Sequence, residues 1–301
     1  MNWKFSTCVE LLSRAAEYSK TEGTLSCEAL ARFLVAREAF YSGKSAEETR
    51  AEIGRRIRVT RQAVDRGIRE PQRSFSGLTD GAAAKAARSE SWPIEDSLFR
   101  LAITYSLAIN EVNACGGKIV AFPTAGSSGI VPGILWAYRD AREPSLDHES
   151  PRFQDAFTVA SAVGIIIAST ATLAGAAGGC QAECGAAGAM AAAGLSCLLG
   201  EDAASAFDSA ALSLKNSLGL ACDPIAGLVE VPCVKRNAFL AGNALVAVSL
   251  LRAGVKSAVP FDEVVSAMKS IGDSMPASIR ESAEGGLALT PTGIAVRERI
   301  K

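Results

Sequence analysis

The stretch AFTVASAVGIIIASTATLAGAAGGCQAECGAAGAMAAAGLSCLLG, residues 156–200, decides the fold of this 301-residue chain. Glu183 is its only charged residue. Its β-branched residues, such as those at 165–167, lie inside a helical periodicity, and no hairpin dipeptide interrupts it. Alanine and glycine are abundant, and small side chains allow helices to approach one another closely. We therefore predict tightly packed, buried helices here.

A membrane-spanning helix is the alternative interpretation of this stretch, because residues 156–182 carry no charge. Few of the side chains in residues 156–179 are strongly apolar, however, and alanine, glycine, serine and threonine insert poorly into lipid. The strongly apolar ones are Phe157, Val159, Val163, Ile165, Ile166, Ile167 and Leu173. We favour helices in the core of a soluble protein, with no membrane.

The rest of the chain also predicts helices. They are expected through residues 1–70, with Ser26 and Ser45 as N-caps, and then at 82–88, 95–114, 130–142, 203–217, 238–251, 261–272 and in the tail 287–301. Strand signals are nearly absent. The predicted fold class is all-α: one compact helical domain with buried Ala/Gly-rich helices and glycine-rich loops.

Composition excludes several classes of function. The formal net charge of −1 provides no basic face for nucleic acid. The first residues, MNWKFSTCVELLSR, lack the pattern of a secretory signal, so we expect a cytoplasmic protein. Thiols stay reduced in the cytoplasm, so the eight cysteines are expected to be buried apolar residues or metal ligands rather than disulfides.

The loop PTAGSSG, residues 123–129, precedes the apolar helix predicted at 130–142. Its backbone N–H groups and hydroxyls converge at a helix N-terminus, where an anion is favoured. The loop lacks the Gly-Lys-Ser/Thr of a phosphate-binding loop and the glycine spacing of a dinucleotide site. A carboxylate is the more natural ligand, although a plain turn that caps the helix stays open. Residues 76–79, Ser-Gly-Leu-Thr, are either a similar turn or a substrate contact.

Three cysteines lie within two residues of glycine or proline in otherwise weakly charged segments: Cys180 in GCQAECG, and Cys222 and Cys233 at the ends of CDPIAGLVEVPC. Their spacing is not that of the C-x2-C pairs in zinc fingers or bacterial ferredoxins. Close backbone approach at these positions would offer N–H groups to the sulfurs. Three protein ligands leave one coordination position vacant, which is typical of catalytic rather than structural metal sites.

Five motifs carry a resemblance over nearly the whole chain: SGLTDG at 76–81, NEVNACGGKIVAFPTAGSSGIVPG at 110–133, GCQAECGAAGAMAAAGL at 179–195, LGLACDPIAGLVEVPCVKRNAFLAGNAL at 218–245 and GGLALTPTG at 285–293. The chain resembles the iron–sulfur-dependent L-serine dehydratases, in particular the α chain of the two-chain form. Two positions depart from the family pattern: Cys184 replaces a usual aliphatic residue, and Asp80 replaces a usual glycine.

The resemblance implies one catalytic domain over residues 1–301, with a charge-rich helical part at 1–90 and a cluster-binding core at 91–301. It implies a [4Fe-4S] cluster held by Cys180, Cys222 and Cys233. The reaction would be conversion of L-serine to pyruvate and ammonia, with the open iron as Lewis acid for the leaving hydroxyl. Pyridoxal phosphate is not expected, because no lysine lies in a recognisable Schiff-base setting.

We predict that the substrate, a small amino acid, is held by the loop at 123–129. The expected contacts are Thr124, Ser127, Ser128 and Gly129, followed by Lys235 and Asn237, and by Ser76 and Thr79. Glu183 must find partners in so apolar a stretch.

No general base is convincing in this chain, because its single histidine, His148, lies in a polar connection typical of solvated loops. The resemblance implies that a β chain supplies the missing groups. Three alternatives stay open: a related lyase that acts on cysteine or threonine, a membrane transport subunit, and a structural zinc protein.

Overall fold

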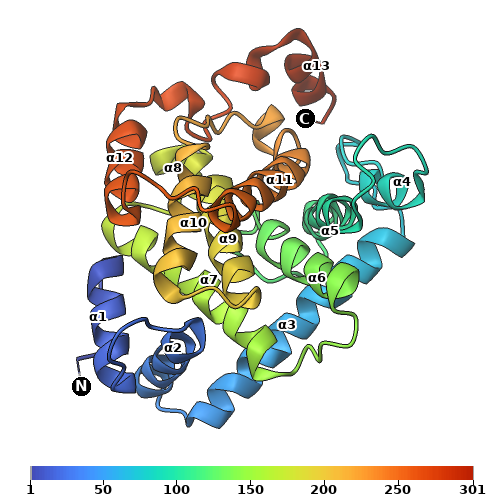
Figure 1. Cartoon of the computed structure of the whole chain (residues 1–301). Helices are drawn as coiled ribbons and strands as arrows, with labels where there is room; N and C mark the ends of the chain where they lie inside the picture. The colour runs from blue at the N-terminus through green and yellow to red at the C-terminus, as the bar shows by residue number, and fades with distance from the viewer. Residues whose placement is uncertain (1, 301) are drawn as a thin grey trace.

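A computed structural model describes residues 2–300, and its regular elements are all helices (Figure 1). The α-helices are α1 (Cys8–Ser19), α2 (Cys27–Ser42), α3 (Ala46–Arg69), α4 (Ala82–Arg88), α5 (Ser97–Ala114), α6 (Ile130–Arg142), α7 (Pro151–Thr170), α8 (Gly175–Gly178), α9 (Ala186–Leu198), α10 (Ala203–Lys215), α11 (Cys233–Arg252), α12 (Phe261–Ser274) and α13 (Pro291–Arg299). A π-helix η1 (Gln181–Gly185) and the 3-10 helices η2 (Ile225–Gly227), η3 (Ala277–Ile279) and η4 (Gly286–Leu289) complete the set. The predicted all-α fold class is confirmed.

Helix α9 lies at the centre, packed against α6, α7, α10 and α11 (Figure 1). Every residue from Ala186 to Leu198 is buried. Glycines permit this packing: a Cβ at Gly194 would lie 2.9 Å from the carbonyl oxygen of Ala156, and one at Gly164 would lie 3.1 Å from Met190 Sδ. Helices α7 and α9, the two long helices of the Ala/Gly-rich stretch, therefore pack in the core of the molecule, as predicted.

Helix α7 is long and apolar enough to cross a membrane by length and composition alone. Within the protein, 67% of its most apolar window is buried against other elements. Such burial is expected of a core helix, because a helix that is apolar all round is covered by its own protein in a soluble fold.

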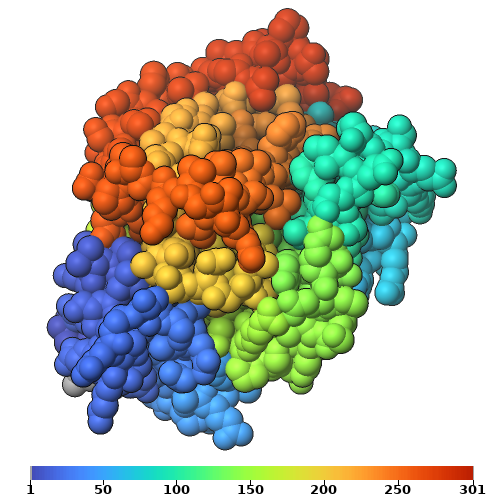
Figure 2. All heavy atoms as spheres, in the orientation of Figure 1, coloured from blue at the N-terminus to red at the C-terminus, as the bar shows by residue number. Residues whose placement is uncertain are grey.

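The N-terminal helices pack directly on this core. Ser26 and Ser45 cap α2 and α3 as predicted, and Ser45 forms a capping box with Glu48. The carboxylate of Asp262 on α12 accepts a hydrogen bond of 2.7 Å from the backbone N–H of Cys8, which joins the first helix to the end of the chain. Figure 2 shows the resulting contact between the blue N-terminal and orange C-terminal segments on the front face.

The structure differs from the sequence prediction around the cysteines. Helix α11 begins at Cys233, five residues before the predicted start, because Pro232 is tolerated at a helix N-terminus and the backbone N–H of Val234 bonds to Glu230 O at 2.9 Å. The helical stretch at 156–200 is interrupted between α7 and α9, and continues through the π-helix after Cys180. Such π-turns are frequent at functional sites.

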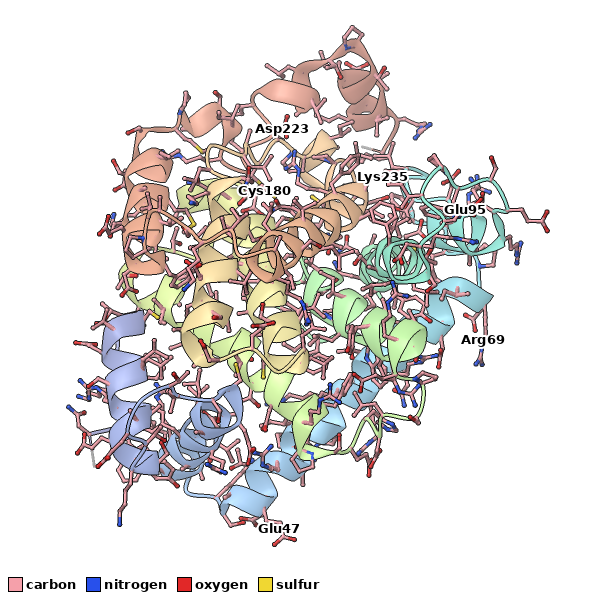
Figure 3. All side chains as sticks on the ribbon, in the orientation of Figure 1. Glu47, Arg69, Glu95, Cys180, Asp223 and Lys235 are labelled. Carbon is pink, nitrogen blue, oxygen red and sulfur yellow. The ribbon has the colours of Figure 1, made fainter. Side chains whose placement is uncertain are left out.

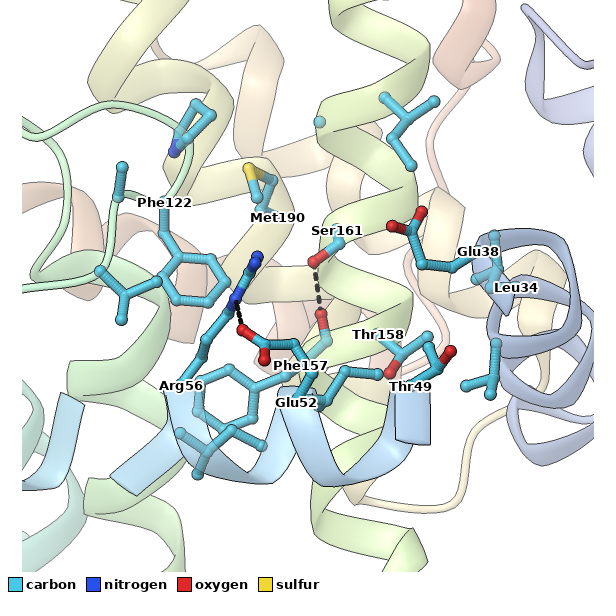
Figure 4. Close-up of a pocket in the computed structure, with 18 of the residues that line it drawn as sticks. Leu34, Glu38, Thr49, Glu52, Arg56, Phe122, Phe157, Thr158, Ser161 and Met190 are labelled. Atoms are coloured by element: carbon cyan, nitrogen blue, oxygen red, sulfur yellow. Dashed lines mark hydrogen bonds and ion pairs between the residues drawn. The ribbon is translucent and has the colours of Figure 1, made fainter. Parts of the chain in front are cut away.

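A cavity of about 450 Å³ lies between α2, α3, α7 and residues 120–123 (Figure 4). Its lining is largely apolar and includes Leu34, Ile53, Phe157 and Met190. It backs onto Phe122, just before the 123–129 loop, but no cysteine lines it. The cavity is therefore separate from the thiols described next.

Candidate active site

Cys180, Cys222 and Cys233 come from three segments and are all buried, with 1%, 3% and 7% of their surface exposed. Backbone hydrogen bonds hold the segments together: Gln181 N donates to Leu220 O at 3.2 Å, and Cys222 N donates to Ile279 O at 2.8 Å. Figure 3 shows Cys180 and Asp223 close together in the upper part of the view, far from Glu47 on α3. The fold thus brings the predicted ligands to one region.

A fourth thiol and one guanidinium complete this group. Hydrogen bonds with the thiols of Cys184 and Cys222, and then the nearby charge of Arg236, lower the pKa of Cys180 well below its usual value. Burial raises the pKa of Cys233 to about 12. Arg236, whose side chain is 14% exposed, also donates to the carbonyl oxygen of Ala221 at 2.8 Å. The electrostatics favour one thiolate in a metal-free site.

Lys235, which we predicted as a substrate contact, is exposed on α11, whereas its neighbour Arg236 is the basic residue at the thiols. Lys235 adds to the effect of Lys85, whose ion pair of 2.6 Å with Asp80 is the main cause that lowers the pKa of Asp80. Sequence alone did not distinguish the two adjacent bases. The helical start at Cys233 decides which of them faces inward.

Two carboxylates lie beside Cys222. Among residues 2–300, the group found with three ligand atoms all within 4.8 Å of one another is Glu183, Cys222 and Glu281. Glu183 Oε2 is 3.8 Å from Cys222 Sγ. A Cβ at Gly175 would lie 2.7 Å from Glu183 Oε2, 3.1 Å from Glu281 Oε2 and 3.2 Å from Cys222 Sγ, so a larger residue there would displace these side chains. These residues form a candidate metal-binding group that shares Cys222 with our prediction.

Burial raises the pKa of Glu183 to about 7, and the nearby charges of Cys180 and Glu281 add to the effect. The partners expected for Glu183 are therefore Cys222 and the hydroxyl of Thr124. Their hydrogen bonds lower the pKa of Glu183 and so oppose the effect of burial. Glu281 was not predicted. It occupies a left-handed conformation with φ of 62°, and its backbone N–H donates to Cys222 O at 2.6 Å, a long-range contact that no local pattern signals.

The loop at 123–129 faces the same carboxylate. A Cβ at Gly126 would lie 3.8 Å from Glu183 Oε1 and 3.9 Å from Thr124 Oγ1. Ser127 and Ser128 are fully buried, and Ser127 Oγ donates to Phe122 O at 3.0 Å. The N–H of Gly129 donates to Asn237 Oδ1 at 3.0 Å. Of the predicted loop contacts, Thr124 points its hydroxyl toward Glu183 beside the thiols. Ser127 and Gly129 bond to other groups of the protein, and the hydroxyl of Ser128 is buried.

Ser76 and Thr79 lie around a different carboxylate. Ser76 Oγ donates to Glu230 Oε1 at 2.8 Å, and Thr79 Oγ1 donates to Glu230 Oε2 at 2.9 Å. Ser74 Oγ also donates to Glu230, which is 5% exposed. These hydroxyls tie the 76–81 loop to the segment between Cys222 and Cys233. We call the hydroxyls of Ser74, Ser76 and Thr79 on Glu230 the hydroxyl clamp, because they hold the 222–233 segment in place.

Replacing Glu230 with alanine should therefore destabilise the fold. Three buried hydroxyls lose their shared acceptor, and each unsatisfied buried group costs about 1–3 kcal/mol, so we expect a loss of about 3 kcal/mol or more in the free energy of unfolding. Urea unfolding of the purified chain measures it. The matched control is Glu95→Ala, at an exposed glutamate. Equal stability of the two variants would show that the hydroxyl clamp contributes nothing.

His148 is 37% exposed and packs against Trp136, with ring centroids 5.6 Å apart, on the connection between α6 and α7. It is therefore part of a polar surface connection, as expected, and its contacts are not with the cysteines. The described residues next to the thiols thus include carboxylates and a guanidinium, with no imidazole.

Comparison with known proteins identifies the family of this chain. The family model described as serine dehydratase alpha chain matches residues 9–288. The chain belongs to this family. The five motifs of the predicted resemblance lie mostly within the matched range, and they contain Cys180, Cys222, Cys233 and the 123–129 loop.

Three curated relatives show the extent of the similarity. The chain is 43% identical over 273 residues to the probable L-serine dehydratase, alpha chain, of Bacillus subtilis, which covers 89% of this chain and 88% of that protein. It is 42% identical over 254 residues to the L-serine dehydratase, alpha chain, of Peptoniphilus asaccharolyticus, covering 83% and 85%. It is 42% identical over 187 residues to L-serine dehydratase 2 of Escherichia coli, covering 62% of this chain but 40% of that protein.

Proposed function

We propose that this chain catalyses the conversion of L-serine to pyruvate and ammonia as the α chain of a two-chain enzyme. The observation that carries the proposal is the grouping of three buried cysteines with Glu183, which the 123–129 loop faces, in a chain of the serine dehydratase α-chain family. L-serine has a carboxylate for the loop and a β-hydroxyl as leaving group. A soft, buried thiol site next to an anion-binding loop suits both.

The thiols fit the proposed [4Fe-4S] cluster. Thiolates are the usual ligands of iron–sulfur clusters, and three buried thiols from separate segments would leave one iron of the cluster without a protein ligand. When bound, such a cluster supplies a Lewis acid at the iron that carries no protein thiolate. Cys184 is a further thiol at the edge of the site.

The chain's own residues would bind and orient the substrate. Thr124 and the backbone around Gly126 would hold the carboxylate, and the negative charges of Glu183 and Glu281 favour the ammonium end beside Cys222. Asn237, Ser127, Ser128 and Gly129 would shape the loop, while Ser76 and Thr79 would secure the ligand segment through Glu230. Residues 91–301 would form the cluster-binding core, supported by residues 1–90.

A β chain is part of the proposal because the similar proteins of B. subtilis and P. asaccharolyticus are named α chains. The similar E. coli protein is also much longer than the aligned region, which spans 40% of it. The β chain would supply the base that removes the Cα proton. We expect the assembled enzyme in the cytoplasm.

The test is anaerobic co-purification with a candidate β chain, followed by assays of pyruvate from serine and cysteine and of 2-oxobutyrate from threonine. Turnover of serine at the highest kcat/KM supports the proposal. Faster turnover of threonine or cysteine would reassign the substrate, and no turnover of any of the three would reject a lyase.

A further inference from the structure

Two fully buried asparagines, Asn110 and Asn237, donate hydrogen bonds to carbonyl groups of the 123–129 loop. Asn110 Nδ2 donates to Gly126 O at 2.9 Å and to Ala125 O at 3.3 Å. Asn237 Nδ2 donates to the same Gly126 O at 2.8 Å and to Cys233 O at 2.9 Å. Both side chains are 0% exposed. The two amides thus draw both loop carbonyls into the protein, and Asn237 also joins the loop to a predicted cluster ligand.

Fixing a carbonyl also fixes the N–H group on the other side of its peptide bond. In a planar trans peptide the C=O and N–H vectors point in opposite directions. The carbonyl of Ala125 shares its peptide with the N–H of Gly126, and the carbonyl of Gly126 shares its peptide with the N–H of Ser127. Because both carbonyls point inward to the asparagines, both N–H groups point the other way.

These two N–H groups have no hydrogen-bond acceptor among residues 2–300, whereas those of Ser128 and Gly129 have one. The N–H of Ser128 bonds to Ala125 O at 3.3 Å, and that of Gly129 bonds to Asn237 at 3.0 Å. Ser127 is fully buried, and the hydroxyl of Ser128 is buried without a partner. Native proteins rarely leave a buried hydroxyl such as that of Ser128 unpaired, and Gly126 is partly exposed and so open to a ligand; these donors together indicate a missing acceptor.

We propose that Asn110 and Asn237 are positioning residues that aim the N–H groups of Gly126 and Ser127 at the carboxylate of the substrate. The inference rests on the proposed function, and it assigns carboxylate recognition to the backbone rather than to the hydroxyls of Ser127 and Ser128. Consecutive N–H groups are a common anion-binding device, and their bonds to a carboxylate are charge-assisted. Asparagine is required because its amide offers two donors to two carbonyls.

The test uses the assembled, cluster-loaded enzyme with Asn110→Ala, because the amide of Asn110, unlike that of Asn237, donates no hydrogen bond to a cysteine. Loss of its two bonds frees the Ala125–Gly126 peptide, so we expect KM for serine to rise about tenfold or more, with kcat within about threefold. Inhibition by 3-hydroxypropionate should weaken by the same factor. Inhibition by ethanolamine, which lacks the carboxylate, should not change. Asn243→Ala is the matched control, because that amide donates to Ser213 O at 2.9 Å and not to the loop.

The thermal midpoint of each variant reports folding, and Asn110→Ser replaces the alanine variant where the latter is recovered unfolded. An unchanged KM, or equal weakening of both inhibitors, would overturn the inference. These outcomes differ from failure of the proposed function, in which the wild-type enzyme itself would not turn over serine.

Discussion

Replacing Cys222 with serine should remove both the iron and the turnover of serine. Cys222 is 3% exposed, and its sulfur lies beside the thiol of Cys180 and the carboxylates of Glu183 and Glu281. Serine has nearly the same shape, but its hydroxyl is a poor ligand for iron compared with a thiolate. Changes around a metal site already cost 10–100-fold, so loss of a ligand should lower activity by at least about a hundredfold.

The measurement is iron content, visible absorbance and pyruvate formation in variants purified without oxygen. Cys115→Ser is the control, because Cys115 ends α5 outside the thiol group and is only partly buried. It should keep the iron and the activity. If Cys222→Ser kept its iron and its rate, Cys222 would not be a ligand.

The second large effect concerns the partner. Purified without a β chain, this chain should form less than about a hundredth of the pyruvate that the assembled enzyme forms, since removal of a general base typically costs 10²–10⁴-fold. The described residues bring no imidazole to the thiols, and His148 packs on Trp136 instead. Addition of the β chain to the cluster-loaded α chain should restore the rate.

Glu183 is the candidate for a general base within this chain. Its pKa of about 7 suits a general base near neutral pH, and it lies beside Thr124 and Cys222. Full activity of the α chain alone, abolished by Glu183→Gln, would assign proton abstraction to this residue and remove the need for a borrowed base. Glu95→Gln, at an exposed position, is the control for the substitution.

Local signals were sufficient for most of the fold. The helix predicted at 130–142 agrees with α6, and Ser26 and Ser45 cap the predicted helices, because capping and periodicity are properties of a few adjacent residues. The start of α11 was placed too late, since glycine, proline and charge near Cys233 suggested a longer loop. The π-helix after Cys180 was not expected, because it depends on how that segment is anchored to Leu220.

The site was predictable only in part. The motifs were sufficient to predict the family and the proximity of the three cysteines. The contacts that shape the site, however, join segments that are distant in the sequence. Glu281 lies beside Cys222, Glu230 accepts hydrogen bonds from Ser76 and Thr79, and Asn110 donates to the 123–129 loop. No spacing along the chain encodes such pairs. Hydroxyls that looked free in the sequence, at Ser76 and Ser127, are donors to groups of the protein itself.

The most direct test of the central claim is the amount of iron and acid-labile sulfide per chain after anaerobic purification. A cluster held by Cys180, Cys222 and Cys233 predicts about four of each in the wild type, and a large loss of both in Cys222→Ser. A single zinc ion without sulfide, or iron that Cys222→Ser retains in full, would contradict the account.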